Sequence, residues 1–242
     1  MEPKYKKVLL KLSGEALMEG FDGKSRNDGI IDFDFLDTVC KRIKKVVEGG
    51  TGVAIVVGGG NIWRGAQKPA FDRVRADYMG MLATTINSIG VQDVLIQNGV
   101  PAVVMTALDV GRATKPFNRF EAVELLEKGN VVIFGAGLGT PFFSTDTTAV
   151  VRAAEIGADM VLFAKNIDSV YDKDPRKFAD AVRLEKVTYS RILSENLGVI
   201  DSTAAAFAQS QKINIRMFGL SNPDNIISAA EGKELGTFVY AE

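Results

Sequence analysis

A glycine-rich turn followed by an arginine is the first feature of the chain that could bind a phosphate group. Gly58-Gly59-Gly60 comes directly after the apolar run 53–57, and Arg64 follows it. The short β-branched run predicts an interior parallel strand, and the carboxyl ends of such strands are where open α/β sheets bind ligands. Backbone N–H groups could approach an anion there, with Arg64 as a fixed cation. Three glycines alone are equally typical of a tight turn beside a solvated arginine.

A lysine near the end of the first apolar run is a second candidate for binding an anion. The run 7–12 predicts a strand, and Lys11 is followed closely by Ser13 and Gly14. The ammonium group either lies at a solvated edge or points into the crevice at the strand's carboxyl end. Gly14 favours the second position, because a glycine lets the backbone come close to a ligand.

A second glycine-rich turn resembles a dinucleotide-binding loop only superficially. It covers 135–139 and follows a buried strand predicted at 131–134. The G-x-G-x-x-G spacing fails, because Thr140 replaces the third glycine and Pro141 interrupts the start of the helix. The sequence therefore gives little support to an NAD-dependent dehydrogenase.

Hydroxyl groups and one carboxylate gather after this turn. Ser144, Thr145 and Asp146 precede a helix predicted over 149–156. Ser144 or Thr145 could simply cap that helix. A helix N-terminus with several hydroxyl groups is also suited to bind phosphate or a sugar, because its N–H groups and its dipole favour negative charge.

Two further polar positions could contact a substrate. Asp77 lies in the first turns of a long helix predicted over 71–96, towards the ligand end of the sheet, or is an ordinary solvated carboxylate. A polar loop with Asn166, Tyr171 and Asp174 follows the strand predicted at 159–163. Such loops often carry binding residues, although many loops are simply polar.

The composition excludes several classes of function. The chain has 242 residues, 29 Lys and Arg against 30 Asp and Glu, and no histidine. The balanced charge argues against a nucleic-acid partner, and the absence of histidine excludes Ser-His-Asp chemistry and His-ligated zinc. The lone Cys40 predicts a buried core residue rather than a disulfide. No uninterrupted apolar run reaches the roughly 18 residues of a membrane span, so we expect no membrane partner and a cytoplasmic location.

Strand and helix patterns alternate along the whole chain. Strands are predicted at 7–12, 53–57, 102–105, 131–134, 159–163, 213–218 and 237–240. Helices are predicted at 33–48, 71–96, 149–156, 189–196, 201–209 and 223–230 and before 129, and 19–31 is predicted to be a flexible excursion. This alternation predicts an α/β fold, a three-layer sandwich with a mainly parallel central sheet. We expect a single domain over 1–242, with two lobes that meet near residue 129.

Five motifs in register resemble the amino acid kinase family, and most closely its members whose acceptor is UMP. They are KLSG at 11–14, GGGN at 58–61 with Arg64-Gly65, DYMGMLA at 77–83, PFFSTD at 141–146 and KNIDSVY at 165–171 with Asp174-Pro175. The resemblance covers nearly the whole chain. It implies that residues 1–128 form the acceptor-side lobe and residues 129–242 the ATP-side lobe of an amino acid kinase fold.

The resemblance also implies which residues bind each substrate. The ATP site is implied to contain Lys11, Leu12, Ser13, Gly14, Gly60, Arg64, Asn166, Tyr171 and Asp174. The UMP site is implied to contain Gly59, Asp77, Leu138, Gly139, Thr140, Pro141, Phe142, Phe143, Ser144 and Thr145. Lys11, Arg64 and Asp146 form the implied catalytic set, in which Asp146 organises the reacting groups. Mg²⁺ is implied as the companion of ATP, and no residue of the chain is assigned as a metal ligand.

The implied reaction transfers the γ-phosphoryl group of ATP to UMP. A nucleotide phosphate has a second pKa near about 6, so the acceptor oxygen is already deprotonated at neutral pH and no general base is needed. This suits a chain without histidine. The motif of P-loop kinases, G-x-x-x-x-G-K-[ST], is absent.

Two alternatives within and outside the family stay open. The acceptor could be a small carboxylate or carbamate, although Asp77 and the loop 138–145 suit a sugar and a base better. The chain could also be a nucleotide-binding regulator, which would not need Lys11, Arg64 and Asp146 together. The resemblance further implies a homohexamer with GTP and UTP as effectors.

Overall fold

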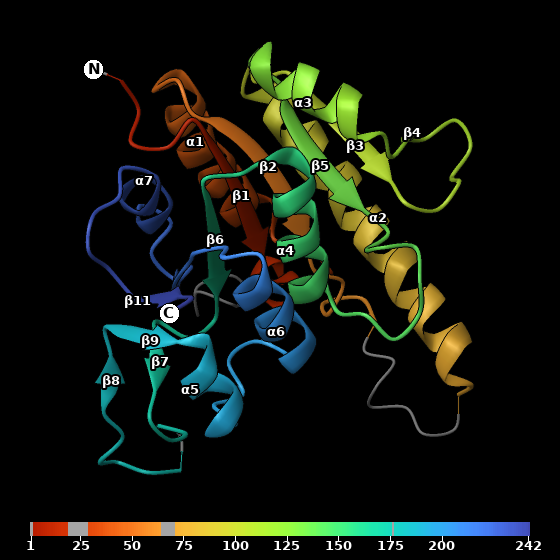
Figure 1. The fold of residues 1–242 in the computed structure, drawn as a ribbon. Coiled ribbons are helices and arrows are strands. Elements are labelled where there is room, and N and C mark those ends of the chain that lie inside the picture. Colours follow the sequence, from red (N-terminus) through yellow and green to blue (C-terminus); the bar gives the residue numbers. More distant parts are fainter. Residues whose placement is uncertain (1, 19–28, 64–70, 176) are drawn as a thin grey trace.

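In the described part of the chain, residues 2–18, 29–63, 71–175 and 177–242 of the computed structural model, nine strands form one sheet. They are β1 (Lys7–Leu12), β2 (Gly52–Val57), β3 (Ala102–Thr106), β4 (Lys115–Pro116), β5 (Val131–Gly135), β6 (Met160–Lys165), β9 (Lys186–Thr188), β10 (Ile215–Gly219) and β11 (Thr237–Tyr240). Their order is β4-β3-β5-β2-β1-β6-β10-β11-β9, and every neighbouring pair is parallel except β10 and β11 (Figure 1).

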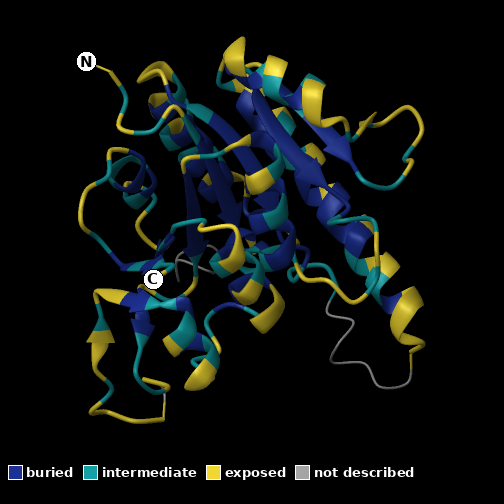
Figure 2. Cartoon of the chain, viewed as in Figure 1, coloured by how far each residue is buried: buried dark blue, intermediate teal, exposed yellow. Residues whose placement is uncertain are grey.

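Helices cover both faces of this sheet. One face packs against α1 (Phe33–Glu48), α2 (Arg73–Gln97) and α7 (Asn225–Ala230). The other packs against α3 (Arg119–Glu127), α4 (Thr145–Ile156), α5 (Tyr189–Ser194) and α6 (Ser202–Ser210). The central strands β1, β2, β5 and β6 are almost wholly buried (Figure 2). The predicted three-layer α/β sandwich with a mainly parallel sheet is therefore confirmed.

The alternation of side chains along β1 explains the two cores. Leu10 and Leu12 lie in the core with α1, whereas Leu9 lies in the core with α4. Successive side chains of a strand point to opposite faces, so a strand buried on both sides is apolar throughout. Lys11 has the parity of Leu9, which places its ammonium group on the α4 face.

Asp32 and Ser144, both named from the sequence as possible caps, do cap helices, but the second helix begins earlier than predicted. Asp32 caps α1, because its Oδ1 accepts from the backbone N of Phe35 at 2.9 Å. The helix predicted at 149–156 instead begins at Thr145. Ser144 is its cap and accepts from the backbone N of Asp146 at 3.0 Å. Because the cap lies so early, Asp146 belongs to the first turn of α4 and not to a loop.

Several short elements carry too little pattern to be predicted. They are a 3₁₀ helix (Gly14–Leu17), β4, β9 and an antiparallel pair of β7 (Val170–Tyr171) with β8 (Arg183–Leu184). The predicted excursion at 19–31 lies mostly outside the described residues. The division into lobes near residue 129 stays a prediction, and β5, which follows that point, lies between β3 and β2.

The long helix α2 is apolar on average as well as long. By length and composition it could cross a membrane, and 50% of its most apolar window is buried inside the protein. The sequence contains no uninterrupted apolar run of that length, because polar residues interrupt α2. Burial of its inner face against β2, β3 and β5 is typical of a core helix, which passes the same test of length and composition.

Candidate active site

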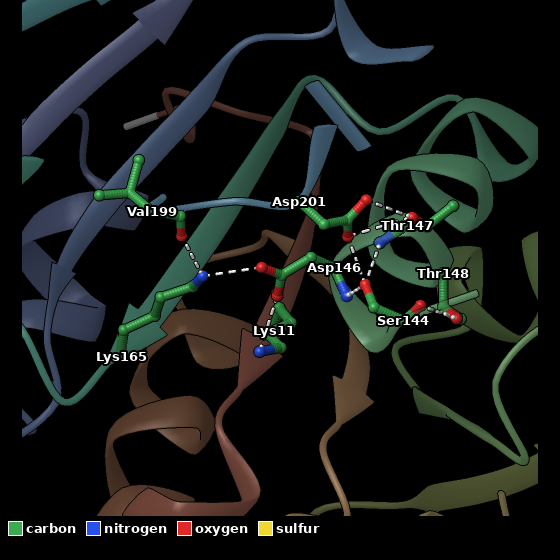
Figure 3. Close-up of polar contacts among 8 residues, drawn as sticks. All are labelled: Lys11, Ser144, Asp146, Thr147, Thr148, Lys165, Val199 and Asp201. Carbon is green, nitrogen blue, oxygen red and sulfur yellow. Dashed lines mark hydrogen bonds and ion pairs between the residues drawn. The ribbon is translucent and has the colours of Figure 1, made fainter. Parts of the chain in front are cut away.

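Two lysines and one aspartate form a buried charged cluster at the carboxyl ends of β1 and β6 (Figure 3). The Nζ atom of Lys11 lies 2.8 Å from Oδ1 of Asp146, and the Nζ atom of Lys165 lies 2.7 Å from Oδ2. The three side chains are 8%, 13% and 14% exposed in the order Lys11, Asp146 and Lys165. Each carboxylate oxygen of Asp146 therefore pairs with a different ammonium group.

The sheet explains why these residues meet. β1 and β6 are neighbours, and Lys11 lies beside Phe163 in the parallel register. Lys165 follows Phe163 with the same parity, so both lysines lie on the face that α4 covers. The Nζ atom of Lys11 lies 6.0 Å from the centre of the Phe163 ring, and the Nζ atom of Lys165 lies 5.2 Å from it. The first turn of α4 places Asp146 between them.

The charges in the cluster act on one another strongly. Burial alone would raise the pKa of Asp146, but Lys11 and Lys165 outweigh it and hold the pKa at about 2. Burial lowers the pKa of Lys165, and the attraction of Asp146 offsets only part of that effect. Asp146 is therefore a firmly ionised carboxylate, and the charge of Asp201 also acts on Lys165.

Hydrogen bonds fix the cluster to the segment before α6. The Nζ atom of Lys165 donates to the carbonyl of Val199 (Figure 3). Asp201 caps α6 by accepting from the backbone N of Ala204 at 2.8 Å. Asp201 also accepts from the hydroxyl groups of Ser144 and Thr147, the latter at 3.0 Å. The start of α4 and the start of α6 are thus held together.

Two turns meet next to Lys11. A Cβ atom on Gly14 would lie 2.5 Å from the carbonyl O of Gly58 and 2.8 Å from the backbone N of Gly60. Only glycine allows an approach of this kind. The turn after β1 and the turn after β2 therefore meet backbone to backbone close to Lys11.

A small cavity of about 160 Å³ lies between α2 and the N-terminal end of α4. It is lined by Gly59, Gly60, Trp63, Asp77, Gly80, Met81, Thr84, Gly137, Phe143, Ser144 and Thr145. Five residues implied for the acceptor site come together here, namely Gly59, Asp77, Phe143, Ser144 and Thr145. Leu138, Gly139, Thr140, Pro141 and Phe142 belong to the same loop but do not line the cavity.

Asp77 holds that loop in place. One of its carboxylate oxygens accepts from the backbone N of Phe142 at 2.8 Å, and both accept from Nε of Arg73 at 3.0 Å. Phe142 has φ of 76°, a backbone conformation that favours glycine. The carboxylate has lone pairs to spare and its side chain is 16% exposed, so it can accept further hydrogen bonds from a ligand.

A larger cavity of about 490 Å³ lies on the other side of the charged cluster. Tyr171 and Asp174 line it together with Val199, whose carbonyl accepts from Lys165. Its volume suits a nucleoside. Asn166, also implied for the ATP site, does not line this cavity, and its Nδ2 lies 3.4 Å from Oε2 of Glu15.

The implied catalytic set of Lys11, Arg64 and Asp146 lies only partly within the described residues. Lys11 and Asp146 form the ion pair described above, whereas Arg64 lies outside the described residues. Lys165 completes the cluster although the sequence analysis did not place it in the catalytic set. Its signal was its position at the end of a strand, which becomes informative only once β6 is known to lie beside β1.

The described residues contain no group of three or more acidic, cysteine or histidine side chains that could hold a metal ion. Asp146 is the carboxylate closest to both lysines, and each of its oxygens already pairs with an ammonium group. The donor set of the described residues therefore does not fit a metal ion held by protein side chains alone.

Comparison with known proteins places these features in context. The model of the amino acid kinase family matches residues 6–219. A UMP kinase from Bacillus anthracis is 34% identical with a TM-score of 0.91, and the match covers 98% of this chain and 97% of that one. A UMP kinase from Ureaplasma parvum is also 34% identical, with a TM-score of 0.89 and coverage of 98% and 99%. A uridylate kinase from Archaeoglobus fulgidus is 27% identical, with a TM-score of 0.75 and coverage of 96% and 99%.

The lowered pKa of Asp146 predicts a particular pH dependence of stability. Because the folded pKa of about 2 lies below the value of 3.8 in the unfolded chain, the carboxylate stabilises the fold at pH above about 4. That contribution is lost as the pH falls towards 2, and two pKa units correspond to roughly 2–3 kcal/mol. The free energy of unfolding of Asp146→Asn should therefore be lower than that of the wild type at pH 7, with a gap that narrows between pH 4 and pH 2.

Urea unfolding of both proteins across this pH range measures the gap. Asp93→Asn, which changes an exposed carboxylate on α2, serves as the control and should show a small gap at every pH. A gap for Asp146→Asn that stays constant from pH 7 to pH 2 would show that the ion pairs do not lower this pKa.

Proposed function

The chain belongs to the amino acid kinase family, and from this membership and its UMP kinase neighbours we infer that it phosphorylates UMP with ATP as the donor. A phosphate oxygen of UMP attacks the γ-phosphorus of ATP. The bond from that phosphorus to the bridging oxygen of ADP breaks, which gives UDP and ADP. The protein is thus a nucleoside monophosphate kinase.

The observation that carries this proposal is the position of the charged cluster. The ammonium group of Lys165 donates a hydrogen bond to the carbonyl of Val199, and Val199 lines the larger cavity. Asp146 directly follows Ser144 and Thr145, which line the smaller one. A donor nucleotide in the larger cavity and an acceptor in the smaller cavity would bring their phosphates together at Lys11 and Lys165. Ammonium groups at that point stabilise the charge on the transferred group.

The residues of the cluster act by position and charge. The acceptor phosphate is mostly deprotonated at neutral pH, since its second pKa is near about 6. Asp146 is ionised and engaged by two ammonium groups, so it orients Lys11 and Lys165 and does not take up a proton. Arg64 and the backbone of Gly14 and Gly60 are proposed to complete the cradle for the ATP phosphates, next to Leu12 and Ser13.

The remaining ligand contacts are proposed from the family resemblance. Tyr171, Asp174 and Asn166 contact the ribose and base of ATP. Magnesium ion would arrive bound to ATP and would neutralise part of the charge of its phosphates, and no described residue is assigned as its ligand. Asp77 and the loop 138–145 bind UMP.

A direct test follows the release of ADP with UMP, CMP, glutamate and carbamate as acceptors. We expect turnover with UMP to exceed turnover with the other three. Lys11→Ala should lower kcat with UMP by about 100- to 1,000-fold, which is typical for the loss of one preorganised electrostatic contact. Lys41→Ala, which removes an exposed lysine that pairs with Asp37, is the control and should keep wild-type turnover. Preference for glutamate or carbamate, or wild-type turnover in Lys11→Ala, would contradict the proposal.

Asp77 gives a second test, because a ribose contact separates UMP from other acceptors. Hydrogen bonds to a charged partner contribute roughly 1.5–3 kcal/mol, about a 10- to 150-fold effect. Asp77→Asn should raise the KM for UMP far more than the KM for ATP. In the wild type dUMP should be the poorer acceptor, and Asp77→Asn should discriminate less between UMP and dUMP.

The ratio of the activity with UMP to the activity with dUMP is informative because Asp77 also accepts a hydrogen bond from the backbone N of Phe142. Damage to the loop would weaken both acceptors equally and leave the ratio unchanged. Asp93→Asn on the same helix is the matched control. Equal use of UMP and dUMP by the wild type would rule out Asp77 as the ribose contact.

We further propose that the protein assembles into a homohexamer in the cytoplasm and that GTP activates and UTP inhibits it, as the family resemblance implies. An exposed apolar stripe along α2 supports self-association. It consists of Val74, Tyr78, Met79, Leu82, Ile86, Ile89 and Ile96. Contiguous exposed apolar residues on one helix face mark a surface that another protein covers, and a second copy of the chain can bury the same stripe of both partners.

The size of the protein in solution tests this assembly. We expect a mass of about six times 26.1 kDa by light scattering. Leu82→Glu puts a charge into the stripe and should lower the mass, whereas Phe120→Glu changes an exposed residue of α3 and should not. A monomeric wild type would contradict the assembly, and initial rates that do not respond to GTP or UTP would contradict the effectors.

A further inference from the structure

Asn87 is a completely buried amide in the middle of α2 that reaches the glycine turn after β2. Its side chain is 0% exposed. The Nδ2 atom donates to the carbonyl O of Gly58 at 2.7 Å and to Oδ1 of Asn61 at 2.7 Å. The Oδ1 atom of Asn87 accepts from Nδ2 of Asn61 at 3.0 Å. Both donors of one amide thus hold the two ends of the same turn.

Other hydrogen bonds of Gly58 and Gly59 run between main-chain atoms. The backbone N of Gly58 donates to the carbonyl of Leu12 at 2.9 Å, and the carbonyl of Gly59 accepts from the backbone N of Ile62 and Trp63. Its glycines carry no side chains that could pack or form hydrogen bonds. Asn61 is fixed in addition by a hydrogen bond from Nδ2 to the carbonyl of Ile30 at 2.7 Å.

The shape of the turn depends on its contact with α2. A Cβ atom on Gly59 would lie 3.0 Å from the carbonyl O of Gly80 and 3.2 Å from the backbone N of Thr84. The turn therefore rests against the helix backbone. Glycine loses more conformational freedom on folding than any other residue, so three in succession adopt one conformation only when their surroundings fix them.

We propose that Asn87 is a positioning residue for phosphate binding, which acts by fixing the Gly58–Gly60 turn so that the backbone N–H of Gly59 faces the phosphate of the acceptor. The inference rests on the proposed function, because it concerns the phosphate of UMP. Asn87 itself does not line the acceptor cavity, whereas Gly59 and Gly60 do. Without its amide the carbonyl of Gly58 is buried without that partner, and the turn loses its fixed orientation.

Trp63 provides a measurement that does not depend on catalysis. It is the only tryptophan of the chain, it lines the acceptor cavity, and its Nε1 donates to the carbonyl of Ala76 at 2.9 Å. Its fluorescence can therefore report the Kd of UMP and of uridine, which lacks the phosphate. In Asn87→Ala we expect the affinity for UMP to fall about tenfold or more while the affinity for uridine stays within twofold, since a small misplacement of a binding group has effects of this order.

Ser88→Ala is the matched control. Ser88 is also completely buried on α2, but its hydroxyl donates only to the carbonyl of Thr84 within the same helix. If this part of α2 had only a structural role, the affinities for UMP and for uridine would fall alike in Asn87→Ala, or Asn87→Ala and Ser88→Ala would show the same change in affinity. Either result overturns the proposal, as does an unchanged preference for UMP over uridine in Asn87→Ala.

Two further results keep the inference separate from folding and from the proposed function. If Asn87→Ala is not folded by thermal unfolding, Asn61→Ala removes the reciprocal partner at a half-buried position and should show the same selective loss of UMP affinity. Failure of the wild type to form UDP contradicts the proposed function itself. If the wild type does form UDP and the ratio of the affinities for UMP and uridine is unchanged in Asn87→Ala, only the role of Asn87 is contradicted.

Discussion

The site is organised around one buried carboxylate that faces two ammonium groups. Asp146 pairs with both Lys11 and Lys165, so two ammonium groups are held close together away from water, which burial makes costly. The lowered pKa of Lys165 reflects its burial together with the nearby charge of Lys11. The carboxylates of Asp146 and Asp201 offset part of that cost. The phosphate chain of the proposed donor would bring further negative charge to the two ammonium groups.

The backbone beside this cluster adds a second constraint. Gly14 and Gly58 lie so close that neither position has room for a side chain. Their contact brings the ends of β1 and β2 together and leaves a surface of main-chain atoms next to Lys11. An anion that binds there meets N–H groups and an ammonium group at once, with no side chain in between. A parallel sheet supplies this geometry because the carboxyl ends of all its strands lie at one edge.

Much of this arrangement could be predicted because it is local in sequence. Lys11 lies near the end of a recognisable strand and Gly14 follows that strand closely. Gly58–Gly60 follows a second recognisable strand. The pairing of Lys165 with Asp146 could not be predicted in the same way, because it depends on the order of β1 and β6 in the sheet. The early start of α4 was missed although Ser144 was a candidate cap, because residues 145–148 are all polar and the apolar part of the helix begins only at Ala149. Elements as short as β7 and β8 carry no periodicity at all.

The helix α2 explains why hydrophobic pattern alone was a poor guide to burial. Its inner face carries Thr84, Asn87 and Ser88, which are buried and hydrogen-bonded, whereas Leu82 and Ile86 are exposed. These polar residues are inside because two backbone turns have hydrogen-bond partners on this face of the helix. The hydroxyl of Thr84 accepts from the backbone N of Ala136, and the amide of Asn87 donates to the carbonyl of Gly58. Leu82 and Ile86 lie on the outer face of the same helix, whereas Val91 and Leu95 are buried. Since a helix is stiff over a few turns, any displacement of its outer face also moves the inner residues that hold both turns. Contacts made on the outside of α2 and the geometry of the site therefore share one structural element.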